Sequence, residues 1–426
     1  MSGRDKPVTS DEFAAALTKL GGARRYIVAV SGGPDSMALA RLSASLASPR
    51  DILAVTVDHG LRPAARAEAE TAGRWCRAAG LDHRILTWEG DKPNAALQAN
   101  ARSARYRLLA GLAAQEGYEA ILTAHNADDQ AETVFMRFAR GAGPSGLAAM
   151  EGRMLIASGA DDPVRLLRPL LGVSRARLVA TLESFAQDSI ADPSNDDQGF
   201  ERVRTRALLA ALEEQDLLTR DALCRTAPRM QAAARRLAAE DAETFARAGG
   251  CFHRFGWASF DVWEAASASL TARLVRAIGA GDHAPDEAEA AAALEAVAAS
   301  GAATLGGAMF RREGGRLYIF REPAALLGRA GVAPLAPVEI APAGRVLWDR
   351  RFIIENTGDR PIRVAPLGNI GARARSLYGA PPEALAASPG VFADAAESPK
   401  TVDQTPDLRA FSLLEERFSG SVLRFS

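Results

Sequence analysis

The chain has 426 residues, of which 48% are hydrophobic and 24% are charged, and its formal net charge is −1. This length is sufficient for two or three domains with a large buried core, and the composition is that of an ordinary globular protein. The near-neutral charge excludes a uniformly basic surface, so a nucleic-acid partner would have to bind local patches. Arginine would dominate such patches, because the chain has only four lysines.

The three cysteines are far apart in the sequence, at Cys76, Cys224 and Cys251, and no CxxC pair occurs. This spacing argues against a redox dithiol, a zinc ribbon or a cluster site, and it fits a reducing cytoplasm. The N-terminal segment has no apolar signal core, and no apolar run approaches the ~20 residues that a membrane span needs. We therefore expect a cytoplasmic protein without a membrane partner.

The first 130 residues alternate between helix and strand patterns. A helix is expected after Thr9, which can form a capping box with Glu12, and the pair Gly21-Gly22 ends it. Four β-rich runs follow, separated by amphipathic segments of helix length: 26–30, 52–59, 83–88 and 119–125. This alternation predicts an α/β fold with a doubly wound parallel sheet that helices cover on both faces.

Polar residues follow three of these expected strands at the point where each ends. They lie at 31–36, 58–60 and 125–132. In open α/β sheets, ligands bind beyond the carboxyl ends of the strands. The three strand ends therefore predict one shared site.

The pattern changes after about residue 215. Three helical stretches are expected, the first of them interrupted by Pro228: 221–249, 263–279 and 285–300. Residues 302–322 predict a hairpin that turns at Gly314-Gly315, and the proline-containing segment 327–344 predicts a linker. We therefore expect three domains, at 1–215, 216–326 and 345–426: the α/β domain, a mainly helical domain and a small C-terminal α+β domain.

The segment "SGGPDS" (31–36) lies between the first expected strand and a helix. Such a glycine-rich turn can direct backbone N–H groups at a phosphate. It matches neither the GK[ST] loop nor GxGxxG. The hydroxyls of Ser31 and Ser36 could contact phosphate oxygens, and Asp35 could contact a metal or the loop itself. Composition alone leaves open that the turn only caps a helix.

Three acids open the helix after the fourth strand, within "HNADDQAET" (125–133): Asp128, Asp129 and Glu132. Acids are common in a first helical turn because they complement the helix dipole, and that interpretation stays open. Beside a phosphate loop, however, they would repel a bound phosphate unless a cation lies between. Mg²⁺ or the ammonium group of a substrate would serve.

The string "SGGPDS" resembles the pyrophosphate loop of the N-type ATP pyrophosphatases. Four further segments narrow the resemblance: "VDHGLR" (57–62), "HNADDQAET", "RPLL" (168–171) and "DPSNDDQGFERVRTR" (192–206). Together the five segments resemble the tRNA(Ile)-lysidine synthetase family over roughly residues 25–210. The sequence departs from the family at Val203, where asparagine is usual, and near Ala210, where a proline is usual. The last domain also matches the family's tRNA-binding module poorly.

The resemblance implies an adenine nucleotide alpha hydrolase-like domain with a defined reaction. ATP adenylates O2 of the wobble cytidine in an isoleucine tRNA with a CAU anticodon. Free L-lysine then displaces AMP at C2 and gives lysidine, with pyrophosphate and AMP as the other products. Mg²⁺ would accompany ATP, and a homodimer is compatible with the resemblance.

The resemblance also assigns roles to residues. Six loop residues would hold the β and γ phosphates: Ser31, Gly32, Gly33, Pro34, Asp35 and Ser36. Asp35 is the first candidate for a Mg²⁺ ligand. Two residues would line the ATP side of the site: His59 and Arg62. The remaining candidates would bind or activate the substrates: His125 for a phosphate or O2 of the base, Asp129 and Glu132 for the lysine ammonium group, and Arg206 for its carboxylate.

Several alternatives stay open. Arg206 could lie on an exposed helix face, and His125 could be structural only. A related enzyme could thiolate a tRNA cytidine, although the cysteines lack the context for sulfur transfer. The chain could also be an ATP-binding module without catalysis, which would not need the acids of 128–132.

Arginine-rich segments after residue 220 are the candidates for tRNA contact. Three lie in the last domain: "DRRF" (349–352), "RPIRV" (360–364) and "GARARSLYGAPPEAL" (371–385). A fourth lies on an expected helix, where Arg225, Arg229 and Arg236 share one face.

Overall fold

The computed structural model describes residues 6–46, 51–90, 92, 97–191, 198–281, 284–329, 333–368, 379–392 and 400–425. The stretch 192–197 of the "DPSN" segment and residues 371–378 of "GARARSLYG" lie outside the described residues. The contacts divide the chain into two compact units, Met1–Arg235 with Val422–Ser426, and Arg236–Ser421. The three-domain division expected from the sequence stays a prediction.

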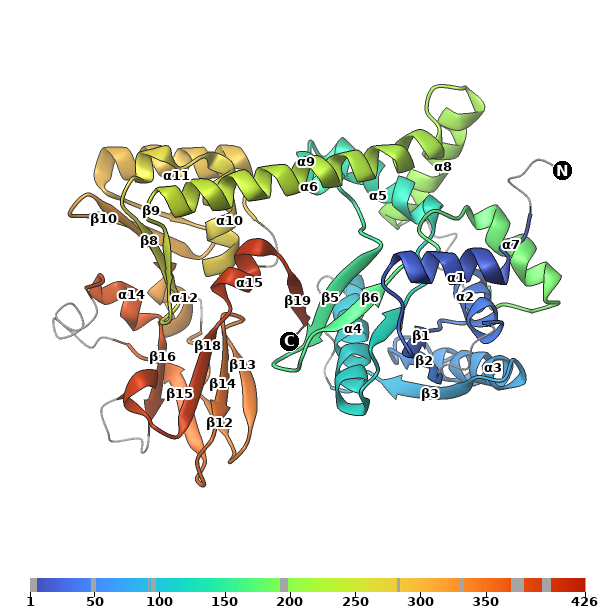
Figure 1. The fold of residues 1–426 in the computed structure, drawn as a ribbon, viewed down its shortest axis with the longest axis horizontal. Helices are drawn as coiled ribbons and strands as arrows, with labels where there is room; N and C mark the ends of the chain where they lie inside the picture. The colour runs from blue at the N-terminus through green and yellow to red at the C-terminus, as the bar shows by residue number, and fades with distance from the viewer. Residues whose placement is uncertain are drawn as a thin grey trace. The chain divides into compact units, whose positions relative to one another are not determined.

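A sheet of seven described strands forms the centre of the first unit (Figure 1), in the order β19-β5-β6-β4-β1-β2-β3. The strands are β1 (Arg25–Ala29), β2 (Asp51–Asp58), β3 (Asp82–Thr87), β4 (Ala120–Leu122), β5 (Arg153–Ser158), β6 (Val164–Leu167) and β19 (Val422–Phe425). All neighbouring pairs are parallel except β5 and β6. The predicted α/β class with a doubly wound, mainly parallel sheet is confirmed.

Helices cover both faces of this sheet, and alternate residues of β1 show why. Tyr26 and Val28 belong to one buried core with Phe13, Met37 and other apolar residues. Ile27 belongs to the opposite core with residues of α4. The helices of this unit are α1 (Ser10–Lys19), α2 (Pro34–Ala44), α3 (Ala65–Ala78), α4 (Leu97–Glu116), α5 (Ala127–Ala139), α6 (Pro144–Leu147), α7 (Arg175–Ser184) and α8 (Glu201–Glu214).

The predicted start of α1 is confirmed. Thr9 Oγ1 accepts a hydrogen bond from the backbone N–H of Glu12, and the Glu12 carboxylate accepts one from the backbone N–H of Thr9. This capping box satisfies two backbone donors at the helix start. The first three predicted strands are confirmed to within one residue at each end, whereas β4 is shorter than the expected 119–125.

The helix α9 (Arg220–Arg247) contains Pro228 in its interior, so the expected interruption there is wrong. The following helical regions are a short 3₁₀ turn η2 (Trp263–Ala265), α10 (Ala268–Ile278) and α11 (Glu287–Ser300). The expected helix at 263–279 is therefore split, because Ser267 caps α10 through its side chain. The helix at 285–300 is confirmed.

The second unit contains a sheet of five described strands in the order β7-β8-β11-β10-β9. The strands are β7 (Cys251–His253), β8 (Trp257–Phe260), β9 (Ala302–Leu305), β10 (Ala308–Glu313) and β11 (Arg316–Arg321). The predicted hairpin is confirmed for β10 and β11, whose turn places Gly314 at φ +57° and Gly315 at φ +84°. The first residues of the segment expected as a hairpin, 302–305, form a further strand, β9, which pairs with β10.

The expected linker at 327–344 contains β12, which pairs with β15, so that interpretation is wrong for this part of the segment. Two small antiparallel sheets complete the unit, β12-β15-β16-β17 and β13-β14-β18 among the described residues. Their strands are β12 (Val338–Ile340), β13 (Arg345–Trp348), β14 (Phe352–Asn356), β15 (Ile362–Pro366), β16 (Pro389–Phe392), β17 (Lys400–Thr401) and β18 (Leu408–Ser412). Short helical segments join them: α12 (Pro323–Leu327), α14 (Pro382–Ala386), η3 (Val402–Gln404) and α15 (Leu414–Ser419).

The "DRRF" segment contributes to the core of this unit. Arg351 is 1% exposed, and its guanidinium donates to Asp349 and to the backbone carbonyls of Gly256 and Ala387. A buried guanidinium that is hydrogen-bonded in this way stabilises the fold. The expectation that this segment offers a tRNA contact is therefore wrong for Arg351.

Candidate functional site

A cavity of about 640 Å³ lies at the carboxyl ends of β1, β2 and β4. The three strand ends predicted to form one site therefore do converge, as expected where the strand order reverses in an open α/β sheet. Eight of the residues assigned from the sequence line it: Ser31, Asp35, Ser36, His59, Arg62, His125, Asp129 and Arg206. Four others, all described by the structure, are not among its lining residues: Gly32, Gly33, Pro34 and Glu132.

The loop after β1 has a conformation that requires glycine. Gly32 has φ +86°, a region that side-chain-bearing residues rarely adopt, and a Cβ there would lie 2.5 Å from Ile190 Cδ1. The backbone N–H of Ile190 donates to the Gly32 carbonyl. Ser36 Oγ accepts from the backbone N–H of Ser31 and donates to the Gly33 carbonyl. These bonds fix the turn and bring both serines to the cavity wall.

The start of α2 is suited to an anion. Gly33 is the N-cap and provides no side-chain cap, and Pro34 occupies the first helical turn. The backbone N–H groups of a first turn have no partner within the helix, and the helix dipole adds partial positive charge there. Because Ser31, Asp35 and Ser36 of this turn line the cavity, a phosphate bound there would face them.

Asp35 is a partly buried carboxylate with one oxygen engaged. Its Oδ2 accepts a hydrogen bond of 3.4 Å from Arg175 Nη2, whereas its Oδ1 is buried without a hydrogen-bond partner. Burial raises the pKa of Asp35 to about 6, Asp129 and Asp128 add to the rise, and Arg175 opposes it. A carboxylate in this setting gains from a second cation.

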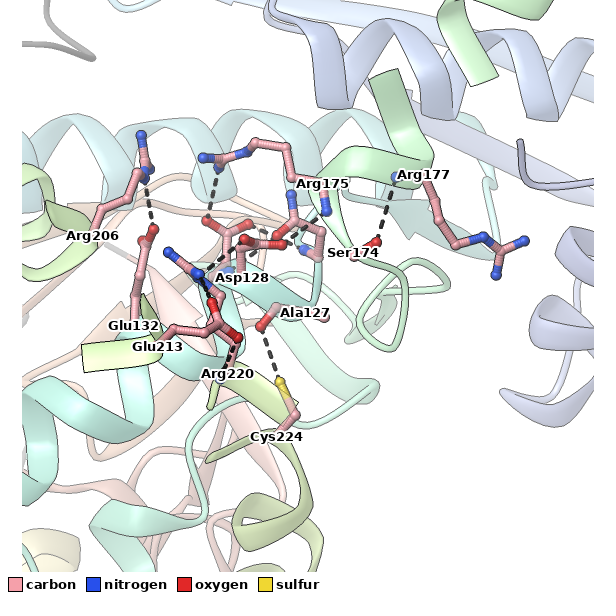
Figure 2. Close-up of polar contacts among 12 residues, drawn as sticks. Ala127, Asp128, Glu132, Ser174, Arg175, Arg177, Arg206, Glu213, Arg220 and Cys224 are labelled. Atoms are coloured by element: carbon pink, nitrogen blue, oxygen red, sulfur yellow. Dashed lines mark hydrogen bonds and ion pairs between the residues drawn. The ribbon is translucent and has the colours of Figure 1, made fainter. Parts of the chain in front are cut away.

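Asp128 and Asp129 differ in what they do. Asp129 forms a capping box with Asn126, since its Oδ2 accepts the Asn126 N–H, and its Oδ1 lies 3.9 Å from Arg175 Nη2. Asp128 accepts the backbone N–H of Arg175 and lies 3.4 Å from Arg220 Nε (Figure 2). Asp128 therefore links α5 to α7 and α9, whereas Asp129 also lines the cavity.

Glu132 and Arg206, which we expected at opposite ends of free lysine, contact each other (Figure 2). Arg206 Nε donates to Glu132 Oε1 at 2.9 Å, and Glu132 is 1% exposed. Glu132 Oε2 is buried without a hydrogen-bond partner, and Arg202 Nε lies 3.9 Å from it. The pair orients Arg206, which lines the cavity while Glu132 does not.

His125 lies at the end of β4 with Nδ1 3.0 Å from Thr123 Oγ1. Burial lowers its pKa well below the ordinary value, and four arginines lower it further: Arg168, Arg102, Arg105 and Arg202. His125 is therefore neutral at neutral pH and can donate one N–H and accept at the other nitrogen. Arg168 of the "RPLL" segment is 4% exposed and donates to the Glu151 carbonyl.

His59 and Arg62 lie on the side of the cavity that β2 provides. The His59 ring packs edge-on against Trp88, its Nδ1 is buried without a partner, and burial lowers its pKa. Arg62 pairs with Glu68 at 2.8 Å. Both line the cavity, but Arg62 shares its charge with an acid of α3.

Sequence reasoning missed several cationic residues of the cavity. Arg102 and Arg105 line it from α4, together with Gln98 and Leu109, at spacings that place all four on one helix face. Arg175 lines it from the first turn of α7. Two sequence signals pointed to these arginines: the i, i+3 spacing of arginines in "ANARSARYR" and the arginine that follows "RPLLGVS". A solvated helix face has the same pattern, so neither signal distinguishes a cavity residue from a surface residue.

The residues fit Mg²⁺ bound together with ATP rather than by protein alone. No three His, Cys, Asp or Glu side chains form a metal-binding group among the described residues. Mg²⁺ characteristically takes one or two carboxylates plus substrate phosphates. The unpartnered Oδ1 of Asp35 beside the phosphate turn fits that pattern.

Two cysteines near this region are poorly suited to sulfur chemistry. Burial raises the pKa of Cys76 and of Cys224 to about 11, so neither thiol ionises near neutral pH. Cys224 Sγ also donates to the Ala127 carbonyl (Figure 2).

Across the described part of the chain, no helix has both the length and the apolar character that a membrane crossing requires.

Known proteins resemble this chain in sequence over most of its length. Residues 7–212 match the PP-loop domain. The tRNA(Ile)-lysidine synthase of Methylobacterium nodulans is 40% identical over 344 residues, which are 75% of this chain and 97% of that protein. That of Rhizobium meliloti is 35% identical over 357 residues, 79% of this chain and 74% of its own.

Among solved structures, the U34-tRNA thiolase NcsA of Methanococcus maripaludis aligns with a TM-score of 0.43 and 18% identity. That alignment covers 52% of this chain and 78% of the thiolase chain. The sequence relatives carry the assignment, because they extend well beyond the PP-loop domain. The chain therefore belongs to the tRNA(Ile)-lysidine synthase family.

Proposed function

We propose that this chain ligates free L-lysine to C2 of the wobble cytidine of an isoleucine tRNA with a CAU anticodon, at the expense of ATP. One observation carries the proposal: a single cavity contains the phosphate turn, the acids Asp35 and Asp129, and the arginines of α4, α7 and α8. An enzyme that activates a base with ATP and then binds a cationic amine needs these three kinds of group together.

In the first step, O2 of the cytosine attacks the α phosphorus of ATP and pyrophosphate leaves. Ser31, Ser36 and the first turn of α2 would hold the phosphates that depart. Asp35 would hold Mg²⁺, which when bound neutralises charge on the leaving phosphates. Arg102 and Arg105 would face the remaining negative charge from α4, and neutral His125 would donate its N–H to a phosphate oxygen or to O2.

In the second step, the ε-amine of lysine attacks C2, and O2 leaves as part of AMP. Lysine arrives as an ammonium ion and must lose a proton before it can attack. Asp129 is the carboxylate of α5 that lines the cavity, so we assign it the ammonium group and that proton. Arg206, held by Glu132, would bind the lysine carboxylate through the guanidinium fork.

The base must leave its stack to reach a cavity at the ends of three strands. Such extrusion costs least in a single-stranded loop, and sequence-specific RNA recognition favours loops for this reason. An anticodon loop is therefore a fitting partner for this site. A thiolation reaction is a poorer fit, because burial raises the pKa of the Cys76 thiol and of the half-buried Cys224 thiol to about 11.

The test is mass analysis of the wobble nucleoside after incubation of the protein with the CAU-anticodon transcript, ATP and L-lysine. The proposal expects cytidine to gain the mass of lysine less one water, with AMP and pyrophosphate released in equal amounts. A cytidine that exchanges oxygen for sulfur would establish thiolation instead. Binding of ATP without turnover in the presence of tRNA and lysine would establish a non-catalytic module.

A further inference from the structure

The strand β19 belongs to the sheet of the catalytic unit although 186 residues of the other unit, 236–421, precede it in the chain. It pairs in parallel with β5, from Val422 opposite Leu155 to Phe425 opposite Ser158. The backbone N–H of Gly159 donates to the Phe425 carbonyl at 2.8 Å. Arg424 Nη1 donates to the carbonyls of Gly159 and Asp161. These bonds fix the end of β19 at the sheet edge.

Phe425 then contacts an aromatic residue of α4. Its ring stacks on the Tyr106 ring with centroids 5.4 Å apart and an interplanar angle of 26°. Tyr106 is 2% exposed and belongs to the apolar core between α4 and the sheet, against which Phe425 also packs. Phe425 is therefore one of the residues that hold the Tyr106 ring in place.

Tyr106 in turn contacts two arginines of the cavity. The guanidinium carbons of Arg102 and Arg105 lie 5.0 Å and 5.3 Å from the centroid of its ring. Guanidinium groups at this distance are attracted to an aromatic ring, which restricts long side chains that would otherwise sample many rotamers. Both arginines line the cavity that we assign to ATP.

We propose that β19, through the stack of Phe425 on Tyr106, positions Arg102 and Arg105 for the phosphates of ATP. This inference rests on the proposed function only in that the cavity binds ATP. Phe425 is a positioning residue, because it acts through Tyr106 and does not line the cavity. Orienting the arginines before ATP binds lowers the ordering cost of binding, so the effect should appear in ATP affinity.

The position of β19 separates this role from general support of the fold. It is an edge strand of four residues, and its neighbour β5 also pairs with β6. Leu423 of the same strand is 46% exposed, so it provides a matched control for the loss of apolar area on β19. Phe425→Tyr would keep the aromatic ring, and Phe425→Leu would keep apolar bulk without the ring.

The experiment measures the dissociation constant of a non-hydrolysable ATP analogue by calorimetry in the full-length protein, without tRNA or lysine. Phe425→Leu should weaken binding about tenfold. Phe425→Tyr and Leu423→Ala should stay within about twofold of the unsubstituted protein. In the full reaction, Phe425→Leu should raise the Michaelis constant for ATP and leave that for lysine unchanged. Phe425→Tyr and Leu423→Ala should change neither constant.

A double-mutant cycle distinguishes positioning from simple destabilisation. In a protein that already carries Arg102→Ala and Arg105→Ala, Phe425→Leu should no longer change the affinity, because the groups through which it acts are gone. An equal loss of affinity in both backgrounds would overturn the proposal, as would an unchanged affinity in Phe425→Leu with only a lower melting temperature.

If Phe425→Leu does not fold, Phe425→Met takes its place in the same cycle. Failure of this inference would leave lysidine formation by the unsubstituted protein intact. Failure of the proposed function would show in that reaction and not in binding of the analogue.

Discussion

Arg175 Nη2 lies 3.4 Å from Asp35 Oδ2 and 3.9 Å from Asp129 Oδ1, so one guanidinium of α7 faces both acids of the cavity. Asp128 contributes to this arrangement, because it accepts the backbone N–H of Arg175 at 2.8 Å. The consequence is electrostatic: two carboxylates beside a phosphate turn stay compatible with one another and with an anionic nucleotide only if cations lie near them.

The first prediction concerns the pH dependence that Arg175 sets. Burial raises the pKa of Asp35 to about 6 while Arg175 lowers it, so activity that needs the carboxylate should fall as the pH drops through about 6. Replacement of Arg175 by Met removes the lowering effect, so the acid limb of the kcat/KM profile for ATP should move to higher pH. Arg175→Lys keeps the charge and should move it less. An acid limb at the same pH in all three proteins would contradict this assignment.

The second prediction concerns Asp35 itself. Asp35→Ala should abolish release of AMP and pyrophosphate with tRNA and lysine saturating, because the cation-binding carboxylate is lost. Near-normal AMP release would contradict this role.

The stability of an Asp35→Asn variant should reveal the same buried charge. A raised carboxyl pKa means that the charged form is disfavoured in the fold. The charged Asp35 carboxylate therefore destabilises the fold. This effect is complete above the folded-state pKa of about 6 and disappears below the unfolded-state pKa near 3.8. Asp35→Asn should therefore be at least as stable as the unsubstituted protein at pH 7, and the difference should shrink as the pH approaches 4. Chemical denaturation at several pH values measures it.

The third prediction concerns the pair of Glu132 and Arg206. Glu132→Gln leaves Arg206 without its charge partner. Removal of one member of a fully buried, hydrogen-bonded pair costs about 2–5 kcal/mol, and this range is an upper bound here because the Arg206 side chain is 34% exposed. We expect the Michaelis constant for lysine to rise at least about tenfold while that for ATP changes little. The control is Glu201→Gln. Glu201 lies on α8, as Arg206 does, and its exposed carboxylate pairs with Arg140. If the Michaelis constant for lysine is unchanged in both variants, Glu132 acts only in the fold of α5 and α8.

The strands that position this site could be predicted from the sequence because they are short β-rich runs followed by polar turns. The first three are placed to within one residue. The fourth expected strand is shorter, because its end departs from the sheet ladder: His125 lies at the cavity and not in a strand.

Other parts of the fold depend on partners that are distant in the sequence. The pairing of β19 with β5 joins residues more than 260 positions apart, and no local pattern indicates it. A proline interior to α9 shows the opposite case, in which a local signal predicts a break that the surrounding helix does not make.

The sequence predicts the cavity residues that belong to a glycine-rich turn or to a cluster of acids. It does not predict the cavity arginines that lie on helices. In sequence, Arg102, Arg105 and Arg175 have the same appearance as solvated surface residues, and only their distance to Tyr106 or Asp35 distinguishes them. For the same reason the pairing of Glu132 with Arg206, 74 residues away, had no local signal.

The fourth prediction concerns how the enzyme holds its tRNA. Arg225, Arg229 and Arg236 are exposed on α9, and their spacing places them near one face of that helix. Arg225 also contacts Asp221, so it should contribute less than the other two. If this face follows a phosphate backbone, replacing all three by Ala should weaken tRNA binding and flatten its salt dependence by up to about three counterions, with ATP binding unchanged.

The matched control removes the same charge from another exposed helix face, through Arg66, Arg74 and Arg77 of α3. Filter binding of the tRNA at several salt concentrations gives the slope for each protein. We expect the α3 triple variant to keep the slope of the unsubstituted protein, because non-contacting surface charges release no counterions. If the α9 variant keeps that slope while the α3 variant loses it, the tRNA lies along α3 and not along α9. If neither changes it, the phosphate contacts come from arginines of the last domain, such as the exposed Arg360 and Arg363 of the "RPIRV" segment.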